Sequence, residues 1–455
     1  MAKLNAQDAS FLALETTGAP MHIGFLLTFK LPAGASADYL QKLHAKLARF
    51  PVDAAPFNMR LKHKEGWSQL RPEWEVDDAV DLEYHLRHEA LPWPGGEREL
   101  GLAISRLHTL PLERSRPLWE CTLIEGLQPR RFALYIKIHH ALADGVGMMN
   151  QLSRALAESP RGASLPLWSA SVTPPPPDKD TQAVDEDWRR FFEGLLEGMG
   201  KPKSARKPSS GIPRGPRCIL NGDTTGRRRF ATQRLELARI KAVAETAEAT
   251  VNDAVLAVCS GALRAYLEEF DRIPRDSLIV SVPVALPRER GQTIGNAVAG
   301  VHASLATQIA DPKKRLLAIR DSMREAKDEF KRLPASLSRA INSLGMLAMM
   351  MVPKHDNPDP ENAAFSNLTI SNVPGPKKKL YFHGAEMDGM YPVSVLTGDH
   401  RLNITVLGYH EGLHFGFTAC PDTLPSVQKL ALQLEPALRD LERAVGVGRA
   451  ARPAR

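Results

Sequence analysis

A long stretch in the middle of the chain cannot contribute to a hydrophobic core. It opens with four consecutive prolines at 174–177, continues through charged residues, and ends in a run rich in Pro, Ser, Gly, Lys and Arg at 201–216. Such a composition is typical of a linker, so it divides the chain into two folding parts. The expected organisation is an N-terminal half over 1–172, a linker over 173–215, a C-terminal half over 216–448 and a basic tail over 449–455.

Both parts show the two periodicities of regular secondary structure. Residues 132–139 alternate in the way that predicts a strand, and after Gly145 the apolar residues recur at helical spacing. The same patterns predict further strands at 277–284, 365–371, 402–409 and 413–418, and helices at 37–50, 252–267 and 311–331. We therefore expect an α+β fold with two halves, each containing a sheet covered by helices.

Composition and charge exclude several classes of protein. Apolar residues make up 43% of the chain and charged residues 24%, which is the balance of an ordinary globular protein. The formal net charge of +7 indicates either a solvated basic surface or attraction to anionic groups such as phosphates or acidic lipids. Nucleic acid is not an expected partner, because the basic runs lack interleaved aromatic residues that could stack on bases.

The cysteines and the N-terminal residues indicate in which cellular compartment the protein resides. The four cysteines are far apart, with no CxxC pair and no zinc-like spacing, which fits a reducing compartment. Residues 1–24 lack the basic and apolar blocks of a secretory signal. The apolar run at 340–353 is too short to span a membrane as a helix and indicates a buried or interfacial helix. We expect a cytoplasmic protein, with peripheral contact at the inner membrane or lipid inclusions as an option.

Two neighbouring histidines end the predicted strand and begin the sequence HHALADG at 139–145. Successive side chains of a strand point to opposite faces, so His139 and His140 cannot readily serve the same reacting atom. We expect one histidine to be catalytic and the other to support it, because a neutral imidazole is available as a base at neutral pH. Asp144 and Gly145 fall at the turn before the next helix, where an aspartate can fix the loop, cap the helix or form a salt bridge.

Two other interpretations of this segment stay open on the residues alone. A histidine at a strand end is commonly structural or merely exposed. His139, His140 and Asp144 could instead bind a metal ion, although no further cluster of His, Cys or carboxylates stands near them in the sequence. A phosphate-binding loop is not indicated, because the chain contains neither GxxxxGK[ST] nor GxGxxG.

Several segments carry a resemblance to a known family. HHALADG is similar to the HHxxxDG motif of the acyltransferase superfamily that includes chloramphenicol acetyltransferase, carnitine acyltransferases and peptide-synthetase condensation domains. More specifically, the chain resembles the bacterial wax ester synthase/diacylglycerol acyltransferase (WS/DGAT) family along nearly its whole length. The other matching segments are NAQDASFLALETTGAPMHIG at 5–24, SRPLWE at 115–120, ND at 252–253 and FSNLTISNVPGPKKKLYFHGAEM at 365–387.

The resemblance implies a role for each residue of the motif. His140 would be the general base, His139 would support the local structure, Asp144 would hold the motif in shape, and Gly145 would permit the tight turn. The implied fold has two chloramphenicol-acetyltransferase-like halves, each a mixed sheet covered by helices, with the active site at their interface. The substrate-site candidates outside the motif are Pro117, Leu118, Trp119, Asn252 and Asp253.

Ordinary structural roles account equally well for some of these candidates. Trp119 could belong to the core, and Asn252 could be the N-cap of a helix. The Met-rich run at 344–352 is expected either to contact lipid or to form a core helix. The basic runs at 227–229 and 377–379 could contact CoA phosphates or anionic lipid headgroups, or they could form a solvated surface.

The activity implied by the resemblance is transfer of a long-chain acyl group from acyl-CoA to a fatty alcohol, which gives a wax ester. A second implied acceptor is diacylglycerol, which gives triacylglycerol. Acyl-CoA would be a co-substrate, with no permanently bound cofactor. The alternatives are a related acyltransferase for a different alcohol or an amine, and a non-catalytic lipid-binding or lipid-droplet surface protein.

Overall fold

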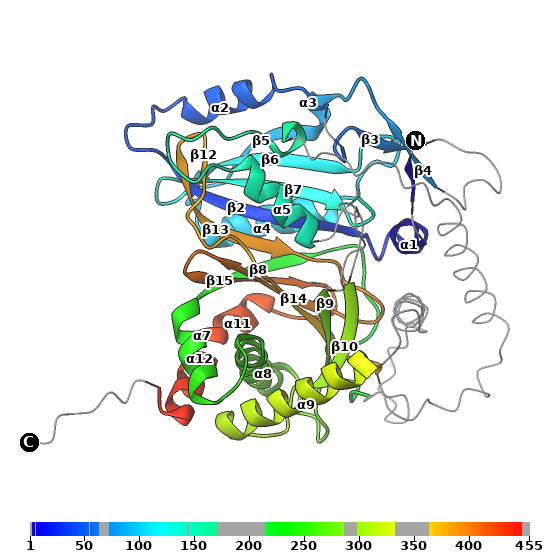
Figure 1. Cartoon of the computed structure of the whole chain (residues 1–455), viewed down its shortest axis with the longest axis vertical. Helices are drawn as coiled ribbons and strands as arrows, with labels where there is room; N and C mark the ends of the chain where they lie inside the picture. The colour runs from blue at the N-terminus through cyan, green and yellow to red at the C-terminus, as the bar shows by residue number, and fades with distance from the viewer. Residues whose placement is uncertain are drawn as a thin grey trace, which may run out of the picture. The chain divides into compact units, whose positions relative to one another are not determined.

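The computed structural model describes residues 2–4, 6–53, 55–62, 72–142, 145–170, 214–285, 298–332 and 364–447. The chain divides into two compact units (Figure 1). Each unit contains a mixed six-stranded sheet with helices packed on it, so the expected α+β fold is confirmed. The first unit comprises residues 1–199, 286–297 and 373–395, and the second comprises residues 200–285, 298–372 and 396–455.

The first unit is built on a sheet with the strand order β12-β13-β2-β7-β6-β5. Neighbouring strands are antiparallel, except that β5 and β6 run parallel. Nearly every residue of β2 and β7 is buried, because these central strands are covered on both faces. The strands are β2 (His22–Lys30), β5 (Leu86–Ala90), β6 (Trp119–Leu127), β7 (Arg131–His139), β12 (Tyr381–Phe382) and β13 (Ala385–Val393).

Helices cover both faces of this first sheet. Helix α4 contributes His108, which contacts Tyr135 of β7, whereas α2 packs Tyr39 against Phe132 on the opposite side of that strand. The helices of the unit are α1 (Ala6–Leu14), α2 (Tyr39–Leu47), α3 (Leu82–His85), α4 (Glu97–Thr109) and α5 (Gly145–Ala155). A small separate sheet joins β1 (Ala2–Lys3), β4 (Glu73–Val76) and β3 (Met59–Leu61).

The second unit contains a sheet with the strand order β10-β9-β11-β14-β15-β8. Strands β9 and β11 are parallel, whereas the pairs β14–β15 and β15–β8 are antiparallel. The strands are β8 (Arg229–Glu236), β9 (Ile279–Ala285), β10 (Val298–Ser304), β11 (Leu368–Val373), β14 (Leu402–Tyr409) and β15 (Gly412–Ala419). The helices are α7 (Leu237–Thr246), α8 (Val251–Phe270), α9 (Pro312–Arg332), α11 (Val427–Leu432) and α12 (Leu434–Val445).

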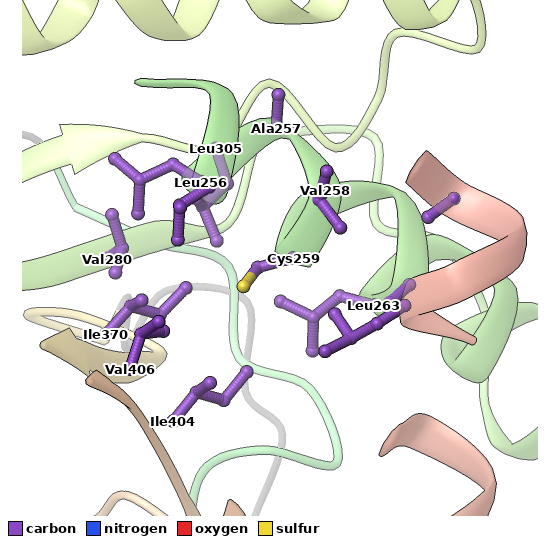
Figure 2. Packing of buried hydrophobic residues seen from close by; sticks show 14 of the residues in the cluster. Leu256, Ala257, Val258, Cys259, Leu263, Val280, Leu305, Ile370, Ile404 and Val406 are labelled. Carbon is purple, nitrogen blue, oxygen red and sulfur yellow. The ribbon is translucent and has the colours of Figure 1, made fainter. Parts of the chain in front are cut away.

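Helix α8 lies at the centre of the core of the second unit. Its middle is apolar on nearly every side, and such a helix is stable only when it is buried all round. Helix α9, in contrast, buries a single stripe that includes Leu316 and Ile319. Figure 2 shows residues of α8 packed close to side chains of the sheet; the labelled residues include Leu256, Cys259, Leu263, Val280, Ile370, Ile404 and Val406.

The predicted elements agree with the structure except near their ends. The strands predicted at 132–139 and 402–409 are β7 and β14, and the helices predicted at 252–267 and 311–331 are α8 and α9. The helix predicted at 37–50 is shorter, and the strand predicted at 365–371 begins at Leu368.

One pairing in the first sheet was not predicted. Strand β13 comes from late in the chain, within the expected C-terminal half, yet it pairs with β2 from Met387 opposite Phe29 to Val393 opposite Gly24. The predicted boundaries at 172 and 216 stay predictions, because residues 171–213 lie outside the described part of the chain. No helix within the described residues is long and apolar enough to cross a membrane, and the run at 340–353 lies outside them.

Candidate active site

The two histidines of the motif lie at the carboxyl end of β7, and neighbouring strands fix their backbone. The His139 amide donates to the Leu118 carbonyl at 2.9 Å, just before β6. The His140 amide donates to the Met21 carbonyl at 2.8 Å, just before β2. The conformation of this pair is therefore set by two segments that are distant in sequence, in addition to β7 itself.

The His139 ring is committed to local structure. It is 1% exposed, and its Nδ1 accepts a hydrogen bond from the Ala141 amide at 3.1 Å. An imidazole that accepts at Nδ1 carries its proton on Nε2. That Nε2 lies 3.6 Å from Oε1 of Glu15, a distance longer than a hydrogen bond but short enough for electrostatic attraction. Neither ring nitrogen is thus available to take a proton from a substrate.

Glu15, which follows α1, is the charged partner of this histidine. Its Oε1 accepts the Met21 amide at 3.0 Å, and its Oε2 accepts from Arg114 at 2.8 Å. Burial raises the pKa of the Glu15 carboxyl, but His139, the Met21 amide and Arg114 together outweigh burial and lower that pKa to about 2. Glu15 is therefore an anion at neutral pH. The sequence patterns did not single it out as a site residue.

The His140 ring has a different environment from that of His139. It is half-buried and stacks on the ring of Phe11 from α1, with the centroids 4.2 Å apart and the planes inclined by 10°. Stacking on an aromatic ring restricts the orientation of an imidazole. The two rings therefore lie in different environments, and the separate roles expected of them stay predictions.

The rest of the motif is described only in part. Ala143 and Asp144 lie outside the described residues. Gly145 is the first residue of α5 and does not adopt a positive φ. A Cβ added to Gly145 would meet Val373 at 3.9 Å, an ordinary contact, so backbone conformation does not explain the tight-turn role expected of this glycine.

The PLW residues belong to the core of the first unit. Pro117, Leu118 and Trp119 are all buried, and the indole Nε1 of Trp119 donates to the Phe57 carbonyl at 2.8 Å. The Trp119 ring stacks on Trp168 and meets the Phe57 ring edge-on. The contact of this segment with the motif is made by its backbone, through the Leu118 carbonyl that accepts the His139 amide.

A buried ion pair lies on the same face of β7 as His139. Lys137 is 1% exposed, and its Nζ lies 3.0 Å from Oε2 of Glu120 while donating to the carbonyls of Leu107 and Leu110. Burial lowers the pKa of Lys137, and the charge and hydrogen bond of Glu120 oppose that shift. Such a buried pair adds little to stability when it is compared with apolar packing.

Further polar contacts extend this layer to β2. Tyr135 Oη lies 2.6 Å from Nδ1 of His108, and Nε2 of His22 contacts the His108 carbonyl at 2.6 Å. Burial lowers the pKa of His22 to about 3, so this ring is neutral at physiological pH. Gly24 is required here, because a Cβ at this position would come within 2.7 Å of the Tyr135 ring.

The Asn252-Asp253 pair lies at the start of α8 in the second unit. The N-cap is Thr250, so the N-cap role expected of Asn252 is wrong. Asp253 forms a capping box with Thr250, in which the Thr250 amide donates to Oδ2 at 2.9 Å and the Asp253 amide donates to Thr250 Oγ1 at 3.2 Å. Asn252 accepts from the Asn372 amide group at 3.3 Å.

The basic runs are largely engaged by the chain itself. Arg227 pairs with an aspartate, Lys378 and Lys379 each pair with a glutamate, and Arg228 is buried. The Met-rich run at 344–352 lies outside the described residues. A cavity of about 320 Å³ lies at the other end of the first sheet from His139, lined by residues that include Lys46, Ser164 and His383. It is therefore separate from the histidine site.

Within the part of the chain that the structure describes, no group of three His, Cys, Asp or Glu side chains is placed to hold a metal ion. The four cysteines are free. Cys121 lies in β6, where burial raises its pKa to about 12. The half-buried imidazole of His140 at the end of β7 is a group that can accept or donate a proton.

Comparisons with known proteins find relatives along nearly the whole chain. Residues 4–255 match the wax ester synthase/diacylglycerol acyltransferase catalytic domain, and residues 294–442 match the WS/DGAT C-terminal domain. The chain is 36% identical to a candidate diacylglycerol O-acyltransferase of Mycobacterium tuberculosis, over 98% of each protein. It is 34% identical to the O-acyltransferase WSD of Acinetobacter baylyi, over 97% of each.

Solved structures give the same result. The wax ester synthase/diacylglycerol acyltransferase from Marinobacter aquaeolei VT8 has a TM-score of 0.79 at 36% identity, covering 98% of this chain and 100% of that one. The first condensation domain of the calcium-dependent antibiotic synthetase shares the fold, with a TM-score of 0.58 at 19% identity over 99% of this chain and 98% of that one. The chain belongs to the wax ester synthase/diacylglycerol acyltransferase family of acyltransferases.

Proposed function

We propose that this enzyme transfers a long-chain acyl group from acyl-CoA to a fatty alcohol, and also to diacylglycerol, with His140 as the general base. The observation that supports the proposal is the difference between the surroundings of the two histidine rings at the end of β7. The His139 Nδ1 accepts a hydrogen bond and its Nε2 faces Glu15 at 3.6 Å, whereas His140 is half-buried with its ring held against Phe11. The choice of acceptors rests on the names of the relatives, which combine wax ester synthase with diacylglycerol acyltransferase.

The proposed reaction is a direct transfer between two bound substrates. Neutral His140 takes the proton of the alcohol while the alcohol oxygen attacks the thioester carbonyl carbon. The tetrahedral intermediate collapses with cleavage of the C–S bond, and the leaving CoA thiolate receives the proton from His140. A covalent acyl-cysteine is not invoked, because burial keeps the Cys121 thiol of the first unit protonated. Acyl-CoA is a co-substrate, and no permanently bound cofactor is part of the proposal.

The other predicted site residues receive supporting roles in this proposal. Leu118 fixes the His139 backbone through its carbonyl, and Pro117 and Trp119 keep that carbonyl in place from within the core. Asp144 is proposed to hold the motif in shape. In the second unit, Asp253 serves the helix cap, and Asn252 stays a candidate for substrate contact. Because both acceptors reside in lipid phases, we place the reaction at the surface of the inner membrane or of lipid inclusions.

An assay of acceptor dependence tests the proposal. The purified full chain is mixed with palmitoyl-CoA and, separately, with hexadecanol, dioleoylglycerol or hexadecylamine. Free thiol and the acylated product are followed together. Thiol release that requires hexadecanol or dioleoylglycerol, with the corresponding ester as product, supports the proposal. Release with hexadecylamine alone would make the chain an amine acyltransferase, and no release with any acceptor would favour a lipid-binding protein.

A further inference from the structure

We infer that Glu15 is a positioning residue that holds both histidines of the motif in their working arrangement. The inference rests on the proposed function of His140 and extends it to the segment of the chain that supports the base. In this inference Glu15 has no direct role toward the proposed substrates or the reacting atoms. It acts through the Met21 backbone and through the His139 ring.

The first route runs through one residue of the backbone. Glu15 Oε1 accepts the Met21 amide at 3.0 Å, and the Met21 carbonyl accepts the His140 amide at 2.8 Å. Met21 is 2% exposed, so water does not readily replace either bond. The carboxylate therefore fixes the residue from which the His140 backbone is held.

The second route is electrostatic and determines the tautomer of His139. With the proton on Nε2, the N–H dipole faces the Glu15 carboxylate, and Nδ1 is free to accept the Ala141 amide. In the other tautomer the lone pair of Nε2 would face the carboxylate, and the N–H on Nδ1 would face the Ala141 N–H. Both contacts would then be repulsive, so the charge of Glu15 selects the form that keeps the turn after β7 closed.

Arg114 anchors the carboxylate and connects it to α1. Its guanidinium donates to Glu15 Oε2 at 2.8 Å and 3.2 Å, and it also donates to the Leu12 carbonyl at 2.8 Å. Leu12 adjoins Phe11, the residue that stacks on His140. The segment from Phe11 to Met21 thus reaches both histidine rings and the His140 backbone, and Glu15 is the residue at which these contacts converge.

Three variants separate this role from that of an ordinary ion pair. Glu15→Gln keeps an oxygen for the Met21 amide but removes the charge, Glu15→Ala removes both, and Glu15→Asp keeps the charge at a shorter reach. The matched control is Glu386→Ala. Glu386 pairs with Lys30 and Lys379, and its pKa is likewise lowered, chiefly by Lys30, but it lies at the opposite end of the same sheet.

The readouts are kcat, KM for palmitoyl-CoA and hexadecanol, and hydrogen exchange of the peptide that contains residues 138–142. We expect Glu15→Ala to lower kcat about 100-fold and Glu15→Gln to lower it about 10-fold, because a misplaced reacting group slows the chemical step. Both KM values should stay within about twofold of wild type. Glu15→Asp should recover part of the loss. Exchange in the 138–142 peptide should rise in Glu15→Ala, because its backbone bonds open more often. Glu386→Ala should change none of these.

Two results would overturn the inference. One is a Glu15→Ala enzyme with kcat within twofold of wild type, and the other is a loss of kcat with unaltered exchange in the 138–142 peptide. If Glu15→Ala does not fold, the isosteric Gln variant carries the test. A wild-type chain that releases no thiol would refute the proposed function instead. Even then, unchanged exchange in Glu15→Ala would overturn the positioning of the two histidines.

Discussion

The His139–His140 segment of the first unit and the Asn252-Asp253 segment of the second are both short polar motifs next to a regular element, yet they are held in different ways. Asp253 pairs locally through Oδ2, with a residue three positions away, and it leads into a helix buried among aliphatic side chains. The histidines are held by residues far away in sequence, and their surroundings include the half-buried charge of Glu15 and the buried charge of Lys137.

This difference indicates what each segment contributes. Helix caps and aliphatic packing contribute directly to the stability of a fold. Ion pairs that are removed from water contribute little net stability, and their main effect is to fix the geometry of the groups around them. We therefore expect the start of α8 to serve stability and the end of β7 to serve the orientation of a half-buried imidazole. Substitutions in the two regions should separate activity from stability.

The largest effect is expected at His140. His140→Ala removes the proposed base, and kcat should fall by about 10²–10⁴-fold, the usual contribution of a positioned proton-transfer group. His140 is half-buried, and its hydrogen bond to the Met21 carbonyl is donated by the backbone amide, which the substitution keeps. The thermal unfolding midpoint should therefore stay within about 4 °C of wild type. A His140→Ala enzyme that keeps wild-type turnover would contradict the catalytic role that distinguishes the end of β7 from the start of α8.

The reverse pattern is expected in the core of the second unit. Leu263→Ala deletes a fully buried side chain of α8 and should lower the free energy of unfolding by about 2–5 kcal/mol. The kcat of the folded fraction should stay within about twofold of wild type. Urea unfolding of the full chain measures the loss, and Leu432→Ala, at a residue that is 65% exposed, is the matched control. A Leu263→Ala enzyme with a lower kcat and an unchanged free energy of unfolding would contradict the structural role given to α8.

The smallest effect is expected at the cap itself. Asp253→Ala removes the capping box and should destabilise the second unit by about 1 kcal/mol while leaving kcat unchanged. Asp440→Ala provides the comparison, because Asp440 is an exposed helical aspartate whose ion pair is of the kind that contributes little. If Asp253→Ala instead lowered kcat at constant stability, Asp253 would belong to the reaction site.

The sequence was sufficient for the elements that local periodicity encodes. The alternation at 132–139 predicted β7, which the structure confirms, and the same alternation predicts opposite faces for the His139 and His140 side chains. The Thr250 cap also has a signal in the sequence, the T-x-x-D spacing of a capping box from Thr250 to Asp253.

Long-range partners were beyond the reach of sequence patterns. Glu15 pairs with Arg114, 99 residues away, and β13 pairs with β2, more than three hundred residues away. Neither contact produces a periodic pattern in the sequence. The only sequence signal for Glu15 was the resemblance of residues 5–24 to the family's N-terminus, which pointed to a segment rather than a side chain. Register and charge pairing are decided when the sheet assembles.

Chemical rescue of the two histidine positions tests the central claim most directly. In His140→Gly, added imidazole can occupy the vacated place against Phe11, and hexadecyl palmitate formation should increase with imidazole concentration. In His139→Gly the missing ring is one that holds the turn after β7 and does not transfer the proton in the proposed reaction. Added imidazole should therefore not restore activity. Rescue of the His139 variant without rescue of the His140 variant would contradict the account.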